Sequence, residues 1–351
     1  MSNTESGDAP GMTPSRPVRP RMRDVAAHAG VGVKTVSRVI NGEPNVTPQM
    51  AARVRKAIVE LGYELDMFAG SLRRLDRRTH SIGVMLGASG NPFSTTITTA
   101  VELVAFEHQS VVLSSSLHTD PNRERDIVMA LLRHRIDGLL LSTATHSLDV
   151  VTAEQQRGLS VVYIDGLPLA READAILSDN AGGARLATRH LLEAGHRRVA
   201  YIGARHDVHT ISERRAGYLT ELAAWGIQPD PALIVEDLTE DSAADAARAL
   251  ASSGASAIFS SQNLCTIGAV RGLRSVDAHR RVALVGFDDI ETGDLLEPGL
   301  TVVRQDPAEM GRIAAERLFA RMDGDRGAAT ITLLPVRLVP RGSGEIPPPA
   351  T

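Results

Sequence analysis

The chain has 351 residues, 43% of them hydrophobic, and a formal net charge of −4 at pH 7. This length and composition fit two or three packed units and exclude a fibrous or wholly disordered protein. The single cysteine, Cys265, excludes an internal disulfide framework and a cysteine-based metal site, and it fits a reducing cytoplasm. No uncharged apolar run reaches the length of about 18 residues that a membrane helix needs, so we expect no membrane partner.

The charge is unevenly distributed along the chain. From Arg16 to Arg78 there are 13 Lys and Arg against 6 Asp and Glu, whereas residues 79–351 hold 25 against 34. The basic N-terminal end is therefore the candidate for binding a polyanion. Residues 1–20 are rich in Pro, Gly and Ser and lack the apolar core of a secretory signal, so we expect a disordered tail there and a second one at 345–351.

Residues 21–66 predict a small all-α domain of three helices. The first helix ends at Gly30, because glycine turns the chain with a positive φ after a helix. The second, within 32–40, has one packing face and one face turned to solvent. The packing face holds Val36, Val39 and Ile40, and the solvent face holds Val33, Lys34, Ser37 and Arg38. The turn through Gly30, with the small Ala26 at the crossing, predicts a helix-turn-helix.

The third helix has the clearest signals in the chain. Thr47 is the expected N-cap, Pro48 takes the first helical position and Gly62 ends the helix. One apolar stripe should cover the first two helices; it consists of Met50, Val54, Ile58 and Leu61. From the helix pattern alone, a generic three-helix bundle with a basic surface stays open as an alternative.

The wording of this segment is more specific than its periodicity. It resembles the head of the LacI/GalR family of bacterial repressors nearly residue for residue, in the pattern DVAxxAGVxxxTVSRVINGxxxVTPxxxxRVxxAxxELGY. The resemblance implies two sets of DNA contacts from the second helix. The side chains that face base edges in the major groove are Val33, Lys34 and Arg38, and those that fix the helix on phosphates are Thr35, Ser37 and Asn41.

The resemblance also implies a hinge at residues 67–79. In the family this segment folds on the operator and drives a leucine into the minor groove, a position that Leu72 matches here. Leu65, Asp66 and Gly70 depart from the usual pattern, and Gly70 costs about 1 kcal/mol of helix propensity relative to alanine. We therefore expect the isolated hinge to be disordered.

From residue 80 onward, short β-rich apolar runs alternate with helix-like stretches. The expected strands are 81–86, 111–116, 137–142, 161–165, 175–179, 198–203, 233–237, 257–261 and 282–288. The expected helices lie near 95–108, 122–134, 181–194, 212–225, 242–252 and 264–273. The alternation predicts an α/β fold with two Rossmann-like lobes. Within 80–344, we expect lobe 1 in about 80–167 and 303–332, and lobe 2 in about 168–302 and 333–344.

Motifs for catalysis and for nucleotide phosphates are missing from the sequence. There is no GxGxxG after a strand, no GxxxxGK[ST], no GxSxG and no HExxH, and the eleven histidines have no ligand spacing. The sequence therefore predicts no catalytic residue, no metal ligand and no cofactor, and a protein that is not an enzyme.

The body also resembles LacI/GalR members and their periplasmic sugar-binding relatives, in SIGVML…NPF, in the DN-x-GG-x-x-x-A-x-x-H-L-x-x-x-GHRR run at 179–198, and in VGFDD. The resemblance implies lobes of the periplasmic-binding-protein type, with a ligand cleft between them at the carboxyl ends of the strands. The implied ligand residues are Asn91, Phe93 and Ser94 from the first lobe and Arg214, Gln262, Asn263, Asp288 and Gln305 beyond it; Thr210 adds a hydroxyl beside Arg214 or caps its helix.

Arg214 and Asp288 have complementary chemistry. Arg214 offers a planar fork of donors and Asp288 offers only acceptors, so the pair suits adjacent hydroxyls of a sugar, or a carboxylate together with a hydroxyl. A salt bridge between the lobes remains the alternative for this pair.

These features together predict a sequence-specific DNA-binding transcriptional regulator, a repressor controlled by a small carbohydrate-like ligand. We expect it to act in the cytoplasm as a homodimer on a near-palindromic double-stranded operator, since a two-fold dimer presents two reading helices about one DNA turn apart. Two alternatives are a small-solute-binding protein without a DNA role and an α/β enzyme fused to a regulatory head.

Overall fold

The computed structural model describes residues 20–40, 42–63, 78–87, 90–116, 123–142, 149–168 and 173–350. The chain divides into two compact units, Met1–Arg77 and Arg78–Thr351. Most of the expected N-terminal tail, and nearly all of the hinge, lie outside the described residues. Two predicted DNA contacts, Asn41 and Leu72, lie outside them as well.

The first unit is a bundle of three short helices, α1 (Met22–Ala29), α2 (Val33–Ile40) and α3 (Pro48–Leu61). Gly30 and Gly62 follow α1 and α3 with φ of 64° and 60°, the left-handed turn that glycine favours. The Thr47 hydroxyl accepts the N–H of Met50 at 3.3 Å and caps α3. Local sequence signals therefore set the ends of these helices, as predicted.

A small apolar core holds the three helices together. Its buried members are Val25, Ala26, Ala29, Val36, Val54 and Ala57. Val39, Ile40, Ile58 and Leu61 pack partly against it. Met50 differs from the prediction because it is 40% exposed; only the turns of α3 from Val54 onward lie against the buried cluster.

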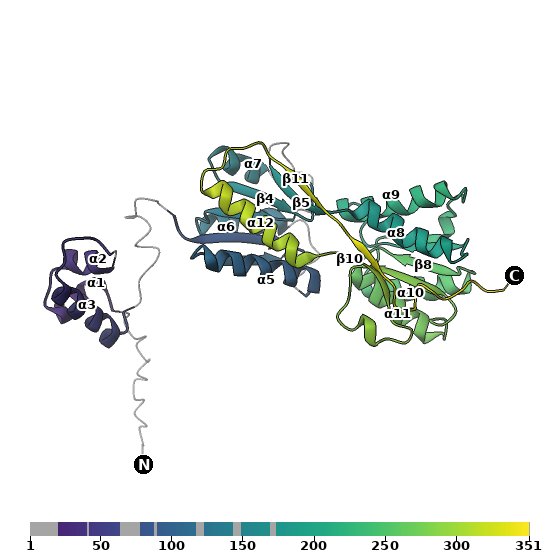
Figure 1. Ribbon diagram of the computed structural model, residues 1–351, viewed down its shortest axis with the longest axis horizontal. Coiled ribbons are helices and arrows are strands. Elements are labelled where there is room, and N and C mark those ends of the chain that lie inside the picture. Colours follow the sequence, from purple (N-terminus) through teal and green to yellow (C-terminus); the bar gives the residue numbers. More distant parts are fainter. Residues whose placement is uncertain are drawn as a thin grey trace, which may run out of the picture. The chain divides into compact units, whose positions relative to one another are not determined.

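The second unit contains two six-stranded sheets (Figure 1). The first sheet has the order β11-β5-β4-β3-β1-β2, and all its neighbouring strands are parallel. Its strands are β1 (Ser81–Leu86), β2 (Val111–Ser116), β3 (Gly138–Leu141), β4 (Ser160–Ile164), β5 (Asp174–Ser178) and β11 (Ile331–Leu334). Its helices are α5 (Pro92–Glu107), α6 (Glu124–Arg133), α7 (Asp149–Gln156) and α12 (Pro307–Met322).

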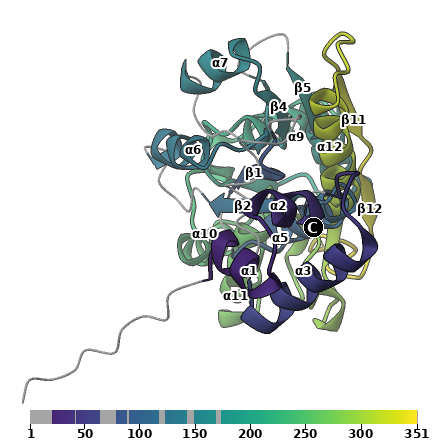
Figure 2. The same ribbon diagram turned by 90° about the vertical axis from the view of Figure 1, so that its left-hand side faces the viewer.

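Both faces of the first sheet are covered because successive strand side chains point to opposite sides. Ile82 and Val84 on β1 face α5 and α12, whereas Met85 faces α6 and α7. Figure 2 shows α6 and α7 on one side of this sheet and α12 on the other. The continuous apolar runs of β1 and β3 follow from this two-sided burial.

The second sheet has the order β12-β10-β9-β8-β6-β7, parallel except for the β10–β12 pair. Its strands are β6 (Val199–Ile202), β7 (Ile234–Val235), β8 (Ala257–Ser260), β9 (Ala283–Phe287), β10 (Thr301–Arg304) and β12 (Arg337–Val339). In Figure 1 two helices lie above it and two below. They are α8 (Asn180–Glu193) and α9 (His209–Ala224) above, and α10 (Glu240–Ser252) and α11 (Asn263–Ser275) below. Two 3₁₀ turns, η2 (Pro231–Leu233) and η3 (Gly293–Leu295), complete the lobe.

The mixed α/β class and the two parallel-sheet lobes are confirmed, but the chain changes lobes at other residues than expected. β5 extends the first sheet to Ser178, β10 keeps the chain in the second sheet to Arg304, and β11 keeps it in the first to Leu334. The sequence suggested changes near 167, 302 and 332 instead. Hydrogen bonds between strands far apart in the chain decide which sheet each strand joins, and the alternation of strands and helices does not report them.

The C-terminal segment is packed, in contrast to the tail expected from residue 345. The Glu345 carboxylate accepts the Thr301 hydroxyl at 2.8 Å and lies beside the ring of His190. His196 is fully buried, and its Nε2 bonds the backbone carbonyl of Ile346 at 2.9 Å. These contacts hold the proline-rich end against the second lobe, which local composition alone does not predict.

Several elements extend beyond their expected bounds. α5 begins at Pro92 rather than near 95, because Asn91 caps it and Pro92 takes its first position. α7, α12 and the strands from β10 onward were not predicted as separate elements. No helix in the described residues is long and apolar enough to cross a membrane.

Asp174 ties α12 to the start of β5. Its carboxylate is almost fully buried and accepts Arg321 Nε at 2.7 Å and the Thr330 N–H at 2.8 Å, and Arg317 Nε lies at 3.0 Å. Burial by itself raises the pKa of Asp174, but the hydrogen bonds from Arg321, Thr330 and Arg317 outweigh it and hold the pKa below its usual value. The ionised carboxylate therefore stabilises the first lobe.

Replacing this carboxylate should destabilise the second unit. We expect Asp174→Asn to lower the free energy of unfolding at neutral pH by about 2 kcal/mol or more, because the arginines lose their buried counter-charge. A depressed folded-state pKa gives stability that is present above the unfolded pKa and is lost as the pH falls through the folded one, so the deficit should shrink in acid. Urea unfolding across pH measures it, with Asp126→Asn on α6 as an exposed control; equal stability of both variants at neutral pH would contradict the role.

Candidate functional site

The solvent face of α2 carries the predicted DNA contacts that the structure describes. Val33 and Lys34 are exposed, and Thr35, Ser37 and Arg38 are half-buried. The opposite face packs into the core through Val36. The helix therefore presents a polar and basic surface to solvent while its apolar side is fixed by α1 and α3.

Arg38 has an acidic neighbour within the same unit. Its Nε lies 3.9 Å from the Glu43 carboxylate, and both side chains are well exposed. A contact of this length in solvent is weak, so the guanidinium can exchange Glu43 for another acceptor at little cost. Lys34, one helical turn earlier, adds a second cation on the same face of α2.

The ligand residues predicted from the first lobe lie where β1 leads into α5. The Asn91 side chain caps α5 by accepting the N–H of Phe93 at 3.0 Å. Ser94 is buried in the first turn, and Phe93 packs partly against the core of the lobe. Because parallel strands end at one edge of their sheet, this loop faces the crevice where open α/β sheets bind ligands.

Asn91 also joins the first lobe to the second. Its side-chain amide pairs with that of Asn263, the first residue of α11. Asn263 Nδ2 donates to Asn91 Oδ1 at 2.7 Å, and Asn91 Nδ2 donates to Asn263 Oδ1 at 3.3 Å. Each amide uses both its donor and its acceptor, so this pair is a direct polar contact across the cleft.

Arg214 on α9 lies at the centre of the carboxyl edge of the second sheet. It is only 3% exposed. Its Nε donates to Asn180 Oδ1 at 2.8 Å, its Nη1 donates to the Ser261 carbonyl at 2.7 Å, and the guanidinium covers the Phe287 ring at 3.8 Å. Most of the guanidinium is therefore already bound within the protein.

Asp288 follows β9 and completes this cluster. Its carboxylate lies 3.6 Å from Arg214 Nη1 and accepts a hydrogen bond from Gln305 Nε2. Arg214 and Asp288 both belong to the second lobe, so the pair is not the salt bridge between lobes that the sequence left open. Of the remaining predicted residues, Thr210 is buried in the first turn of α9 and Gln262 precedes α11 without capping it.

The sequence analysis missed one carboxylate at this edge, Asp165. It follows β4 with φ of 53°, and its Oδ1 is buried without a hydrogen-bond partner in the described part of the chain. Part of its surface stays accessible although it is surrounded by protein atoms. Burial raises the pKa of Asp165 to about 7; the positive charge of Arg214 opposes this effect and the negative charge of Asp288 adds to it. A polar residue directly after an apolar strand was the available signal.

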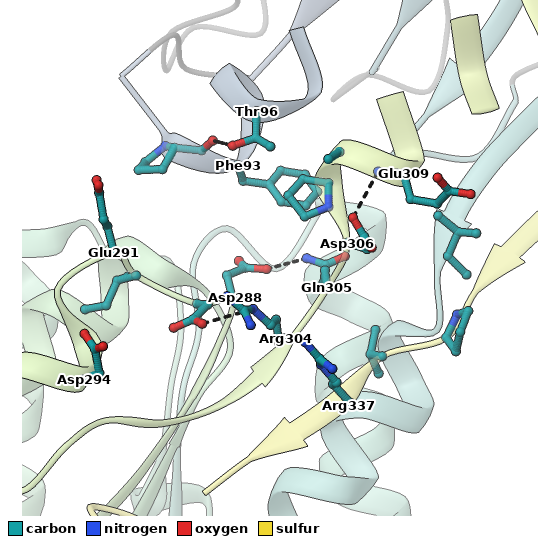
Figure 3. A pocket seen from close by; sticks show the side chains of 18 of the residues that line it. Phe93, Thr96, Asp288, Glu291, Asp294, Arg304, Gln305, Asp306, Glu309 and Arg337 are labelled. Atoms are coloured by element: carbon teal, nitrogen blue, oxygen red, sulfur yellow. Dashed lines mark hydrogen bonds and ion pairs between the residues drawn. The ribbon is translucent and has the colours of Figure 1, made fainter. Parts of the chain in front are cut away.

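A pocket of about 970 Å³ opens beside this cluster (Figure 3). Its walls come from the start of α5, the segment after β9, the start of α12 and the two passages at 304–307 and 334–337. Three predicted ligand residues line it, Phe93, Asp288 and Gln305. The other predicted ligand residues are not on its wall; they are Asn91, Ser94, Thr210, Arg214, Gln262 and Asn263.

Comparisons of the sequence with known proteins match both units. Residues 21–65 match the family model described as bacterial regulatory proteins, lacI family, and residues 188–344 match a periplasmic binding protein-like domain. The chain is similar to the ribose operon repressor of Escherichia coli (strain K12), with 31% identity over 307 residues that cover 86% of this chain and 92% of the repressor. The chain belongs to the LacI family.

Solved structures agree with this LacI-family assignment. A transcriptional regulator CelR–cellobiose complex is 32% identical with a TM-score of 0.69, covering 93% of this chain and 100% of that chain. The lac repressor dimer bound to operator and an anti-inducer has a TM-score of 0.81 at 24% identity, covering 93% and 99%, and it shows the shared fold. The protein is thus a DNA-binding transcriptional regulator rather than an enzyme.

The raised pKa of Asp165 makes the stability of the second unit depend on pH. A carboxyl group whose folded pKa is raised stabilises fully below its unfolded pKa of 3.8, and this contribution is lost as the pH rises to about 7. Asp165→Asn should therefore become more stable than the wild type across this window, by up to about 4 kcal/mol above pH 7. Unfolding free energies at about pH 4.5 and pH 8 measure the difference. A pH-independent difference would contradict the assignment.

Proposed function

We propose that this LacI-family protein is a cytoplasmic repressor that binds a near-palindromic operator as a homodimer and is controlled by a sugar-like ligand between its lobes. The observation that carries the proposal is the combination of an exposed basic α2 in a helix-turn-helix unit with a polar cleft at the strand ends of two lobes. A solute-binding protein without a DNA role has no use for the first of these.

In the proposed complex α2 enters the major groove. Lys34 and Arg38 donate to base edges and Val33 makes apolar contact with a base, while Thr35, Ser37 and Asn41 contact phosphates. Exposure of Val33 and Lys34 supports this assignment. Residues 67–79 form the hinge that inserts Leu72 into the minor groove.

In the proposed ligand complex the nine predicted residues and Asp165 surround the ligand between lobe 1 and lobe 2. The CelR structure in complex with cellobiose and the ribose operon repressor are relatives whose names point to carbohydrates. The direct Asn91–Asn263 contact supports a role in control, because a ligand that enters this edge changes how the lobes meet. Such a change alters operator affinity through the hinge.

A surface for the homodimer lies on the first lobe. Leu103 and Phe106 on α5 are 66% and 82% exposed, and Val111 at the start of the adjacent β2 is exposed as well. Exposed apolar side chains gathered on one helix and the neighbouring strand mark a protein–protein interface more often than a free surface. A second copy of this chain is the proposed occupant.

Operator selection tests the DNA part of the proposal. From a library of random DNA duplexes, the full chain should select two half-sites arranged as a near-palindrome. Lys34→Ala should reduce discrimination against substituted half-sites by about 1–3 kcal/mol in fluorescence anisotropy. Lys56→Ala on α3, which removes an exposed lysine outside α2, should keep the sequence preference. Unchanged discrimination by Lys34→Ala would overturn the reading role of α2.

Charge placed on the α5 surface tests the dimer. Phe106→Glu should weaken self-association at least about tenfold, because it puts a carboxylate into the centre of the proposed interface. Sedimentation equilibrium measures the dissociation constant. Val59→Glu, at an equally exposed apolar side chain on α3, is the matched control and should leave it unchanged. A wild-type monomer, or equal effects of both variants, would refute this surface.

A further inference from the structure

The polar groups of the cleft differ in whether they already have partners. Arg214, the cation at its centre, has Nε and Nη1 bonded to Asn180 and Ser261, Asp288 as a counter-charge at 3.6 Å, and one face covered by Phe287. Its charge and most of its donors are therefore satisfied without a ligand. A carboxylate or phosphate that entered the cleft would have to compete with Asp288 for this guanidinium.

The groups that lack partners are acceptors. Within the described residues, Asp165 Oδ1 and Gln305 Oε1 are buried without a hydrogen bond. Gln305 is 93% buried, since only 7% of its surface is exposed, and it lines the pocket. Its Nε2 is fixed by donation to Asp288, which leaves the carbonyl oxygen as the free end of the amide. Buried acceptors without partners are costly, so a ligand that supplies donors is stabilised here.

The adjoining pocket has the same excess of negative charge. Six carboxylate residues line it, Asp288, Asp289, Glu291, Asp294, Asp306 and Glu309, against three arginines, Arg304, Arg337 and Arg341. Two of these arginines are already neutralised, because Asp289 binds Arg341 at 2.6 Å and Arg304 at 3.1 Å. Figure 3 shows Asp288, Glu291 and Asp294 on the same side of the pocket. An anion therefore meets more repulsion than attraction along this wall.

We infer that the cleft selects an uncharged, polyhydroxylated ligand over the corresponding sugar acid or sugar phosphate. The ligand hydroxyls donate to Asp165, Asp288 and Gln305, and Arg214 positions Asp288 rather than binding a ligand carboxylate. This inference rests on the proposed function, since it concerns the ligand of the same cleft. It also decides between the two ligand chemistries that the sequence allowed for the Arg214 and Asp288 pair.

Matched sugars test the inference. The full chain is titrated calorimetrically at about pH 8, where Asp165 is ionised, with D-ribose, D-glucose, D-galactose and cellobiose, and with the aldonic acid and terminal phosphate of each. We expect at least one neutral sugar to bind and its anionic derivatives to bind at least about tenfold more weakly. Tighter binding of any anion, or of an amino sugar than its neutral parent, overturns the inference, as does the absence of binding by every neutral sugar.

A charge-neutral variant separates electrostatic selection from shape. Asp165→Asn should weaken the neutral sugar about tenfold and weaken its aldonic acid less, so that the ratio between them narrows. Asp126→Asn, an exposed carboxylate on α6, should leave the ratio unchanged. An unchanged ratio in Asp165→Asn overturns the charge argument.

The same preparations report on the proposed function separately. Operator binding by a chain that prefers an anion refutes only the ligand class, whereas loss of sequence-specific DNA binding in a chain that binds neutral sugars refutes only the regulatory role.

Discussion

Parallel strands bring their carboxyl ends to a single edge of each sheet, and every polar group of the cleft depends on this constraint. Asp165, Arg214's partner Ser261, Asp288 and Gln305 each follow a different strand. They are distant in sequence, but the sheets bring them to one place without any local signal. The carboxyl edge of an α/β sheet is where such folds bind ligands, because loops there vary while the strands stay fixed.

The electrostatics of the cleft follow from burial. Asp165 and Asp288 act on the same arginine from different lobes, and the pKa of Asp165 is raised because burial and Asp288 together outweigh Arg214. A cluster of this kind contributes little net stability, since desolvation of the charges cancels much of their attraction. Its value lies in specificity: the buried acceptors favour ligand hydroxyls and disfavour anions. The Asp174 cluster is different, because its carboxylate has both arginines and a backbone N–H to satisfy it.

The three passages between the sheets connect the cleft to the frame of the second unit. Gln305 lies on one passage and both bonds Asp288 and lines the pocket. The Asn91–Asn263 pair adds a contact between lobes that consists of two hydrogen bonds. A few hydrogen bonds are a small part of the energy of either lobe, so the arrangement of the lobes is open to change by a ligand of modest affinity.

The sequence by itself determined the elements whose signals are local. Gly30, Thr47 and Gly62 set the helix ends of the first unit, and the strand runs placed most of both sheets. The membership of β5 and β11 in the first sheet, and the packing of Glu345 against Thr301, were decided by the tertiary structure. The same holds for Asp165, whose chemistry comes from burial beside Arg214 and Asp288. Helix caps and strand periodicity act over a few residues, whereas sheet membership and the environment of a charge depend on segments that meet only after folding.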